Sequence, residues 1–169
     1  MPEPLTKPPR REFQTFWDFP LVTDLDRLEA DVAILGLPYG AAYSIDEVTN
    51  DQTNAPTAIR RLCERSLRGL DRWDFDIGGT LLDGRDIRVV DCGDVIGDQG
   101  DLKGHIRRGE AAVRKILAAG ALPIVLGGDH GIPIPVLRAY EQHGPITLVQ
   151  VDAHMDWRDH MNGVTEGLS

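Results

Sequence analysis

The sequence contains little cysteine and no long apolar run. Its two cysteines, Cys63 and Cys92, lie far apart and form neither a CxxC pair nor a disulfide framework, so we expect a reducing, cytoplasmic environment. No apolar stretch approaches the roughly 20 residues of a membrane span. The Pro-rich start has no apolar segment of the secretory type. We therefore expect residues 1–14 to form a flexible lead.

An excess of basic residues is also missing. The chain carries 27 acidic residues against 18 lysines and arginines, which gives a net charge of −9. This balance argues against nucleic acid or an anionic membrane as a partner. It suits a small cationic ligand, although many soluble acidic proteins share it. With 169 residues, of which 41% are apolar, the chain is long enough for one domain with a core.

Apolar, strand-like runs alternate with helix-like segments. We expect buried strands in 31–40, 87–95, 121–131 and 146–156, and helices in 54–66, 101–120 and 132–144. Residues 15–28 read as a short helix over a sheet edge. This alternation predicts an α/β fold of three layers with a mostly parallel sheet, and residues 15–169 as part of a single domain. Functional residues of such folds gather at the carboxyl ends of the strands.

The first candidate site is the D-x-H-x-D pattern of Asp152, His154 and Asp156. In an extended chain these positions point to the same side, about 7 Å apart along the backbone. Side chains of this length can converge on two ions about 3.5–4 Å apart. Carboxylates with imidazole suit Mn²⁺, and Ni²⁺, Co²⁺ or Zn²⁺ are possible. The alternative is a polar turn whose acids cap a following helix.

The second candidate site is the GGDH stretch, Gly127 to His130, which also follows an apolar run. Two glycines allow a sharp turn, and His130 then projects from the strand end. Alternatively, His130 is a loop residue and Asp129 caps the next helix. Only one helix separates the two motifs, so their strands can be near neighbours and their side chains can share one pocket.

Taken together, these motifs resemble a known family. The stretches GGDHGIPIPVLRA and VDAHMDWRD, with VVDCGDV and NAPTAIR, resemble the ureohydrolases, which include arginases and agmatinases. The resemblance implies an arginase-like fold, two Mn²⁺ ions, homo-oligomers, and hydrolysis of a guanidino compound to urea and an amine or ammonia. By motif position, His130 and Asp156 would ligate one ion, His154 the other and Asp152 both. Asp156 would also steer the attacking water, as the catalytic residue.

The chain departs from the family pattern in two places. It stops at Ser169, before the family's S-x-D-x-D-x-x-D-P motif, which supplies two more aspartate ligands. We therefore expect an N-terminal portion of the domain, with an incomplete centre and little turnover alone. The loop at 36–54 also differs from the family's R-x-G-rich loop. In it, Tyr39, Tyr43 and Asp46 either line the substrate pocket or pack within the loop. The stretch that leads up to Ser169, residues 156–169, likewise differs from the arginase and agmatinase loops, which favours a guanidino acid or free guanidine as the substrate.

Two other functions stay open at this point. The chain could be a catalytically silent subunit that keeps the fold for assembly. It could also be a deacetylase-like amidohydrolase with a single zinc ion. Metal stoichiometry separates these possibilities, because they require two ions for the completed ureohydrolase, one for the deacetylase and none for the silent subunit.

Overall fold

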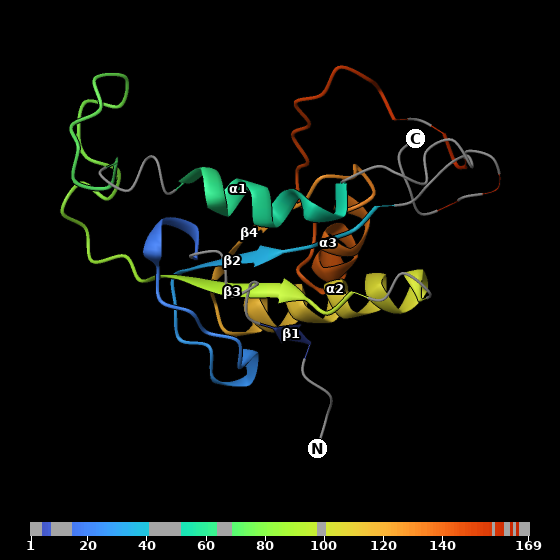
Figure 1. Cartoon of the computed structure of the whole chain (residues 1–169). Coiled ribbons are helices and arrows are strands. Elements are labelled where there is room, and N and C mark those ends of the chain that lie inside the picture. Colours follow the sequence, from blue (N-terminus) through green and yellow to red (C-terminus); the bar gives the residue numbers. More distant parts are fainter. Residues whose placement is uncertain are drawn as a thin grey trace.

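The computed structural model describes residues 5–7, 15–40, 52–63, 69–97, 101–156, 158–160, 163 and 165. Figure 1 shows the arrangement of its elements. The strands are β1 (Thr6–Lys7), β2 (Val32–Gly36), β3 (Val89–Val95) and β4 (Leu122–Leu126), and the α-helices are α1 (Ala55–Cys63), α2 (Leu102–Ala118) and α3 (Pro133–Ala139). Short 3₁₀ helices are η1 (Phe16–Asp18), η2 (Leu25–Arg27), η4 (Gln52–Asn54) and η6 (Tyr140–Gln142).

The four strands form one sheet in the order β1-β3-β2-β4. The central strand β2 is parallel to β3 on one side and to β4 on the other. At the far margin of β3, the two residues of β1 pair in the antiparallel direction. The three parallel strands and their helices confirm the predicted mostly parallel α/β architecture.

Helices cover both faces of this sheet. In the view of Figure 1, α1 lies above the strands and α2 below them. The main core lies between the sheet and α2, where it combines alternate residues of β2 and β3 with one side of the helix. Its fully buried members include Ala33, Leu35, Val90, Cys92, Val113 and Ile116. Burial of apolar surface at this interface is therefore the main stabilising contribution in the described part of the chain.

A bulge interrupts the pairing of β2 with β3. Ile34 pairs with Asp91 and Gly36 with Asp94, so β3 contains one extra residue over this step. Gly93, with a φ of +74°, supplies the left-handed backbone that such a bulge requires. In a regular strand, positions three apart point to opposite faces. The extra residue turns Asp91 and Asp94 to the same face, towards Arg60 of α1.

Two local predictions were wrong. The segment 146–156 forms no strand and bends at residues 153 and 154, and its apolar side chains are open to solvent, with Leu148 62% and Val151 97% exposed. A strand needs a hydrogen-bonded neighbour, and none of the described residues pairs with this segment. Residues 15–28 contain two 3₁₀ turns in place of the expected short helix. The segment does cover part of the β3 edge, as expected, because Leu21 bridges to Asp91, while β1 pairs with Asp94 and Val95.

The expected flexible lead is described only at Leu5, Thr6 and Lys7, of which Thr6 and Lys7 form β1. The Thr6 hydroxyl donates a hydrogen bond to the carbonyl of Thr23 at 2.8 Å, and Thr6 is buried. Residues 1–4 and 8–14 lie outside the described residues. None of the helices in the described ranges combines the length and hydrophobicity that crossing a bilayer requires.

Candidate metal centre

Side chains from two strand-like segments meet beyond the carboxyl end of β4. His130 follows β4, and Asp152 and Asp156 follow the extended segment that starts at Ile146. The Nδ1 atom of His130 lies 2.7 Å from Asp156 Oδ2 and 3.3 Å from Asp152 Oδ2. One potential ligand atom from each of the three residues falls within 4.8 Å of the others. The two sequence motifs therefore share one site.

The turn that carries His130 depends on glycine. A Cβ atom added to Gly128 would lie 2.7 Å from the Cβ of Ala55 at the start of α1, which is closer than real Cβ contacts. Within the turn, the backbone N–H of Gly131 donates to Asp129 Oδ1 at 2.6 Å. Asp129 is buried, whereas the His130 side chain is 35% exposed. The turn thus directs the aspartate inward and presents the imidazole to the site.

Asp152 is held in its ionised form. The backbone N–H of His154 donates to Asp152 Oδ1 at 2.7 Å. This hydrogen bond is the largest of the influences that hold the pKa of the Asp152 carboxyl below its ordinary value, and the positive charge of a protonated His130 adds to it. The residue is exposed as a whole, but its side chain is only 20% exposed. An ionised carboxylate is the form that a metal ion requires.

Asp156 approaches the site from a left-handed turn. Its φ is +48°, a conformation that aspartate tolerates better than most residues. The Gln150 side chain donates from Nε2 to Asp156 Oδ2 at 3.1 Å. The side chain of Asp156 is 21% exposed, close to the 20% exposure of the Asp152 side chain. Sequence analysis gave Gln150 no role, because an exposed Gln in an apolar run carries no distinctive signal.

His154 stands apart from these three residues. Its side chain is 84% exposed, its Nδ1 lies 3.6 Å from Asp152 Oδ1, and it does not belong to the shared group. In the described residues, the structure gathers three of the four predicted ligands, His130, Asp152 and Asp156, into one cluster. The alternation of the D-x-H-x-D pattern is lost because the chain bends at residues 153 and 154 and takes a left-handed conformation at Asp156.

The donor set fits a divalent ion. One imidazole nitrogen and two carboxylates form a mixed set that suits Mn²⁺ and also accepts Ni²⁺, Co²⁺ or Zn²⁺. Since Mn²⁺ favours six ligands, the three residues of the cluster would supply half of its coordination sphere. We therefore describe His130, Asp152 and Asp156 as a partial ligand set for one ion.

Of the three loop residues predicted near the substrate, only Tyr39 is described. It is 3% exposed, and its ring stacks on that of His105 at the start of α2, with 5.8 Å between ring centroids and 21° between planes. Ile106, Leu102 and Ile132 pack around it. Tyr43 and Asp46 lie outside the described residues.

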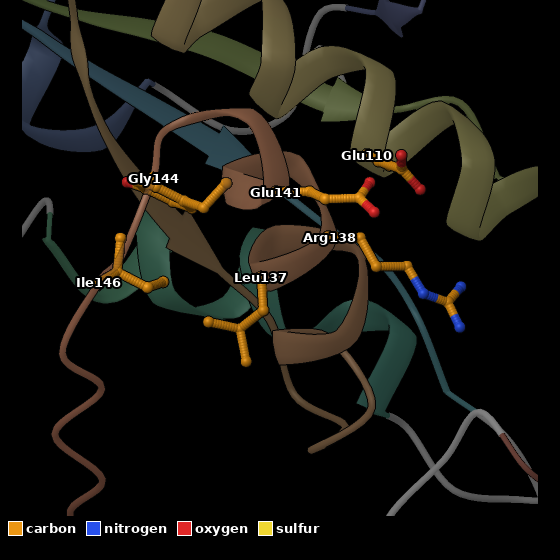
Figure 2. Close-up of a pocket in the computed structure, with 7 residues that line it drawn as sticks. Glu110, Leu137, Arg138, Glu141, Gly144 and Ile146 are labelled. Carbon is orange, nitrogen blue, oxygen red and sulfur yellow. The ribbon is translucent and has the colours of Figure 1, made fainter.

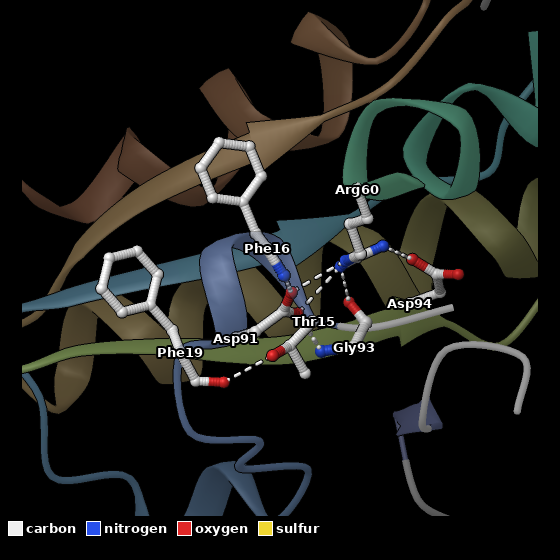
Figure 3. A network of polar contacts seen from close by, with 7 residues as sticks. All are labelled: Thr15, Phe16, Phe19, Arg60, Asp91, Gly93 and Asp94. Atoms are coloured by element: carbon white, nitrogen blue, oxygen red, sulfur yellow. Dashed lines mark hydrogen bonds and ion pairs between the residues drawn. The ribbon is translucent and has the colours of Figure 1, made fainter. Parts of the chain in front are cut away.

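The structure also contains an ionic network that sequence analysis missed. Arg60, from the NAPTAIR stretch, belongs to α1; its fully buried side chain contacts both Asp91 and Asp94 (Figure 3). A signal was present, because Asp91 interrupts an apolar strand and a buried carboxylate almost always requires a charged or hydrogen-bonding partner. The sequence did not indicate which arginine that partner would be.

A separate hollow lies on the outer side of α3. Figure 2 shows its lining, which comes from Glu110 of α2 and from residues between 137 and 146. Its volume is about 610 Å³. Arg114 spans this region, since its guanidinium contacts both Glu110 and Glu141. None of the candidate metal ligands lines the hollow, so it and the ligand cluster are distinct features.

Comparison with known proteins places this geometry in context. The model of the arginase family matches residues 30–168. Among curated relatives, the chain is 35% identical over 144 residues to an agmatinase of Proteus mirabilis, which covers 83% of this chain and 44% of that protein. It is 34% identical over 168 residues to the mitochondrial guanidino acid hydrolase of Homo sapiens, which covers 95% of this chain and 45% of that protein.

A solved structure gives the same result. The proclavaminate amidino hydrolase of Streptomyces clavuligerus is 28% identical, with a TM-score of 0.72 over 99% of this chain and 50% of that protein. The chain thus spans about half the length of the relatives that it matches.

Proposed function

We propose, because this chain belongs to the arginase family, that it supplies the N-terminal part of a metal-dependent hydrolase that cleaves a C–N bond of a guanidino compound. The products would be urea and an amine or ammonia. The observation that carries the proposal is the convergence of His130, Asp152 and Asp156 within 4.8 Å. The names of the relatives, agmatinase and guanidino acid hydrolase, favour this function over a deacetylase or a silent subunit.

The chemistry explains why a metal centre is needed. A guanidinium carbon is a poor electrophile because the positive charge is delocalised over three nitrogens. When bound, divalent ions supply Lewis acidity, which makes water a better nucleophile near neutral pH. His130, Asp152 and Asp156 would hold one such ion, Mn²⁺ in the first instance, and Asp152 and His154 would face a second.

The two carboxylates have further roles in the proposal. Their negative charge attracts a cationic substrate to the site. Asp156 Oδ2 is engaged by His130 and Gln150, which leaves Oδ1 to accept a hydrogen bond from the attacking water and orient it. A leaving amine also needs a proton from a general acid.

A metal titration tests the central observation. Mn²⁺ binding to the purified protein is followed by the loss of the free-ion EPR signal, for the wild type, His130→Ala and His143→Ala. We expect His130→Ala to weaken binding by more than about tenfold, because a direct ligand is lost and even outer partners of ligands contribute that much. His143 is exposed, at the end of η6, so His143→Ala should bind as the wild type does.

Activity is tested on the product of the complete gene that encodes these residues. Urea release is measured with Mn²⁺ and with Ni²⁺ on arginine, agmatine, guanidinobutyrate, guanidinopropionate and guanidine. We expect release from one of the last three, in line with the divergent stretch at 156–169. No urea from any of the five compounds, in a protein shown to be loaded with metal, would remove the hydrolase proposal.

A further inference from the structure

The buried ionic network forms a three-sided clamp around one guanidinium. Arg60 donates from Nε to Asp91 Oδ2 at 2.8 Å and from Nη2 to Asp91 Oδ1 at 2.9 Å. It also donates from Nη1 to Asp94 Oδ1 at 2.6 Å and from Nη2 to the carbonyl of Gly93 at 3.1 Å (Figure 3). The Arg60 side chain is 0% exposed. This planar, forked arrangement uses a geometry that only arginine offers.

The clamp is held from its other side as well. Asp91 also accepts hydrogen bonds from the backbone N–H groups of Phe16 and Gly93, both at 2.8 Å. These contacts fix the carboxylate relative to η1 and to the bulge of β3. Arg60 is the member that belongs to α1, so the network fixes this helix to the carboxyl end of β3.

The opposite end of α1 lies against the turn that carries His130. The backbone oxygen of Gln52 and the Cβ of Ala55 occupy the space that a side chain at residue 128 would need. Gly128 is thus in direct contact with the first turn of the helix, and His130 follows two residues later. The position of α1 therefore limits where this turn, and with it the imidazole, can lie.

We propose that Arg60 is a positioning residue for the metal centre. By fixing α1 to β3, it makes the start of the helix a rigid support for Gly128, and this support keeps His130 Nδ1 beside Asp152 and Asp156. The inference rests on the proposed function, since it concerns the ion that these side chains would bind. Arg60 itself contacts neither the ligands nor the ion.

The test compares Arg60→Lys with Arg108→Lys. Lysine keeps the charge but cannot contact Asp91 and Asp94 with a rigid fork. Arg108 is a matched control, because it donates to the carbonyl of Ile96 beyond β3 and pairs with Asp101, away from α1. We expect Arg60→Lys to weaken Mn²⁺ binding about tenfold, as is typical for residues that orient ligands, and Arg108→Lys to leave it unchanged.

A spectroscopic readout separates positioning from a general loss of stability. At saturating Co²⁺, the visible absorption of Arg60→Lys should differ from that of the wild type, because a displaced imidazole changes the ligand field. A purely structural role would lower the denaturation midpoint and leave this spectrum unchanged. Unchanged Mn²⁺ affinity and Co²⁺ spectrum in folded Arg60→Lys, or equal effects in Arg108→Lys, would overturn the proposal.

A double-mutant cycle tests the route through the helix. Gly128→Ala disturbs the contact between the turn and the start of α1 directly. We therefore expect this variant alone to lose about tenfold in Mn²⁺ affinity, and to lose little more when it is combined with Arg60→Lys. If the two losses of Mn²⁺ affinity multiply in the double variant, the two residues act independently, which would contradict a shared support through α1. If Arg60→Lys does not fold, Asp94→Asn takes its place, because it weakens one arm of the clamp and keeps the pair with Asp91. Wild-type affinity in that variant would then overturn the proposal.

The metal centre and the positioning role fail in different ways. If the wild type binds neither Mn²⁺ nor Co²⁺ at His130, both proposals are wrong. If the wild type binds and His130→Ala does not, the metal centre stands, and the Arg60 variants alone decide the positioning role.

Discussion

Gly36, the last residue of β2, lies where any side chain would overlap the carboxylate of Asp94. A Cβ atom added there would overlap Asp94 Oδ1 and would lie 3.1 Å from Arg60 Nη1. The central strand therefore ends in glycine because the buried ion pair occupies the space beside it.

This close approach predicts a cost for Gly36→Ala. We expect the substitution to lower the free energy of unfolding by about 1–3 kcal/mol, as overpacking of a tight site does. Chemical denaturation measures the effect. Gly69→Ala is the control, because among the described residues its Cβ would meet only Trp17, at 3.8 Å, and its effect should stay within about 0.5 kcal/mol. Equal stabilities of the two variants would contradict this account of β2.

The exposure of His154 predicts an asymmetry between the two histidines of the motifs. We expect His154→Ala to leave the binding of a first Mn²⁺ ion unchanged, because the exposed ring lies apart from the cluster. His154→Pro should weaken binding, because it removes the N–H that donates to Asp152. Titration of both variants by EPR checks this. A large loss in His154→Ala would show that the first ion lies elsewhere.

The buried thiol of Cys92 predicts a dependence of stability on alkaline pH. Burial raises the pKa of Cys92 to about 12, and the charge of Asp91 acts in the same direction against the charge of Arg60. Between the ordinary value near 9 and this raised value, the unfolded thiol loses its proton while the folded one keeps it. Stability should therefore fall as pH rises, by at most about 1.4 kcal/mol per pH unit from this group.

Denaturation curves between pH 8.5 and 11 measure this slope. Cys92→Ala should flatten it, since other alkaline groups titrate alike in both proteins. Cys63→Ala is the matched control, and it should flatten the slope less, because Cys63 is only partly buried. Parallel curves for Cys92→Ala and the wild type would refute the assignment.

The outer strand β4 predicts self-association. Leu122 and Ile124 are 59% and 44% exposed on one face, whereas Val125 packs against the core on the other. Leu122→Lys should reduce association in sedimentation experiments, because a charged side chain blocks pairing at an edge strand. Its stability should change by no more than about 0.5 kcal/mol. Val125→Lys should instead destabilise the fold. Unchanged association in Leu122→Lys would locate the contact on another surface.

The sequence was most informative where local pattern and burial agree. β2 and β3 are apolar runs between polar breaks, and α2 shows apolar positions at helical spacing with Asp101 as its N-cap. The GGDH and D-x-H-x-D motifs indicated three of the residues that meet, His130, Asp152 and Asp156, although the second motif follows no strand in the structure.

The failures have a common physical cause. Residues 146–151 have the composition of a buried strand, yet strand formation depends on a neighbour that hydrogen-bonds to them. The partnership of Arg60 with Asp91 and Asp94 likewise depends on a bulge that reverses the direction of one side chain, which periodicity does not reveal. Both features are set by tertiary contacts between segments far apart in the chain.

The short antiparallel strand β1 makes the two margins of the sheet differ. It pairs with Asp94 and Val95 at the β3 margin, where Leu21 also bridges to Asp91, whereas none of the described strands pairs with the outer side of β4, so a parallel strand can be added to the described sheet beyond β4. Any such strand, advancing about 3.3 Å per residue in step with Leu122–Leu126, would finish level with the GGDH turn. The same margin that can lengthen the sheet would therefore deliver the end of each added strand to the neighbourhood of the His130 imidazole.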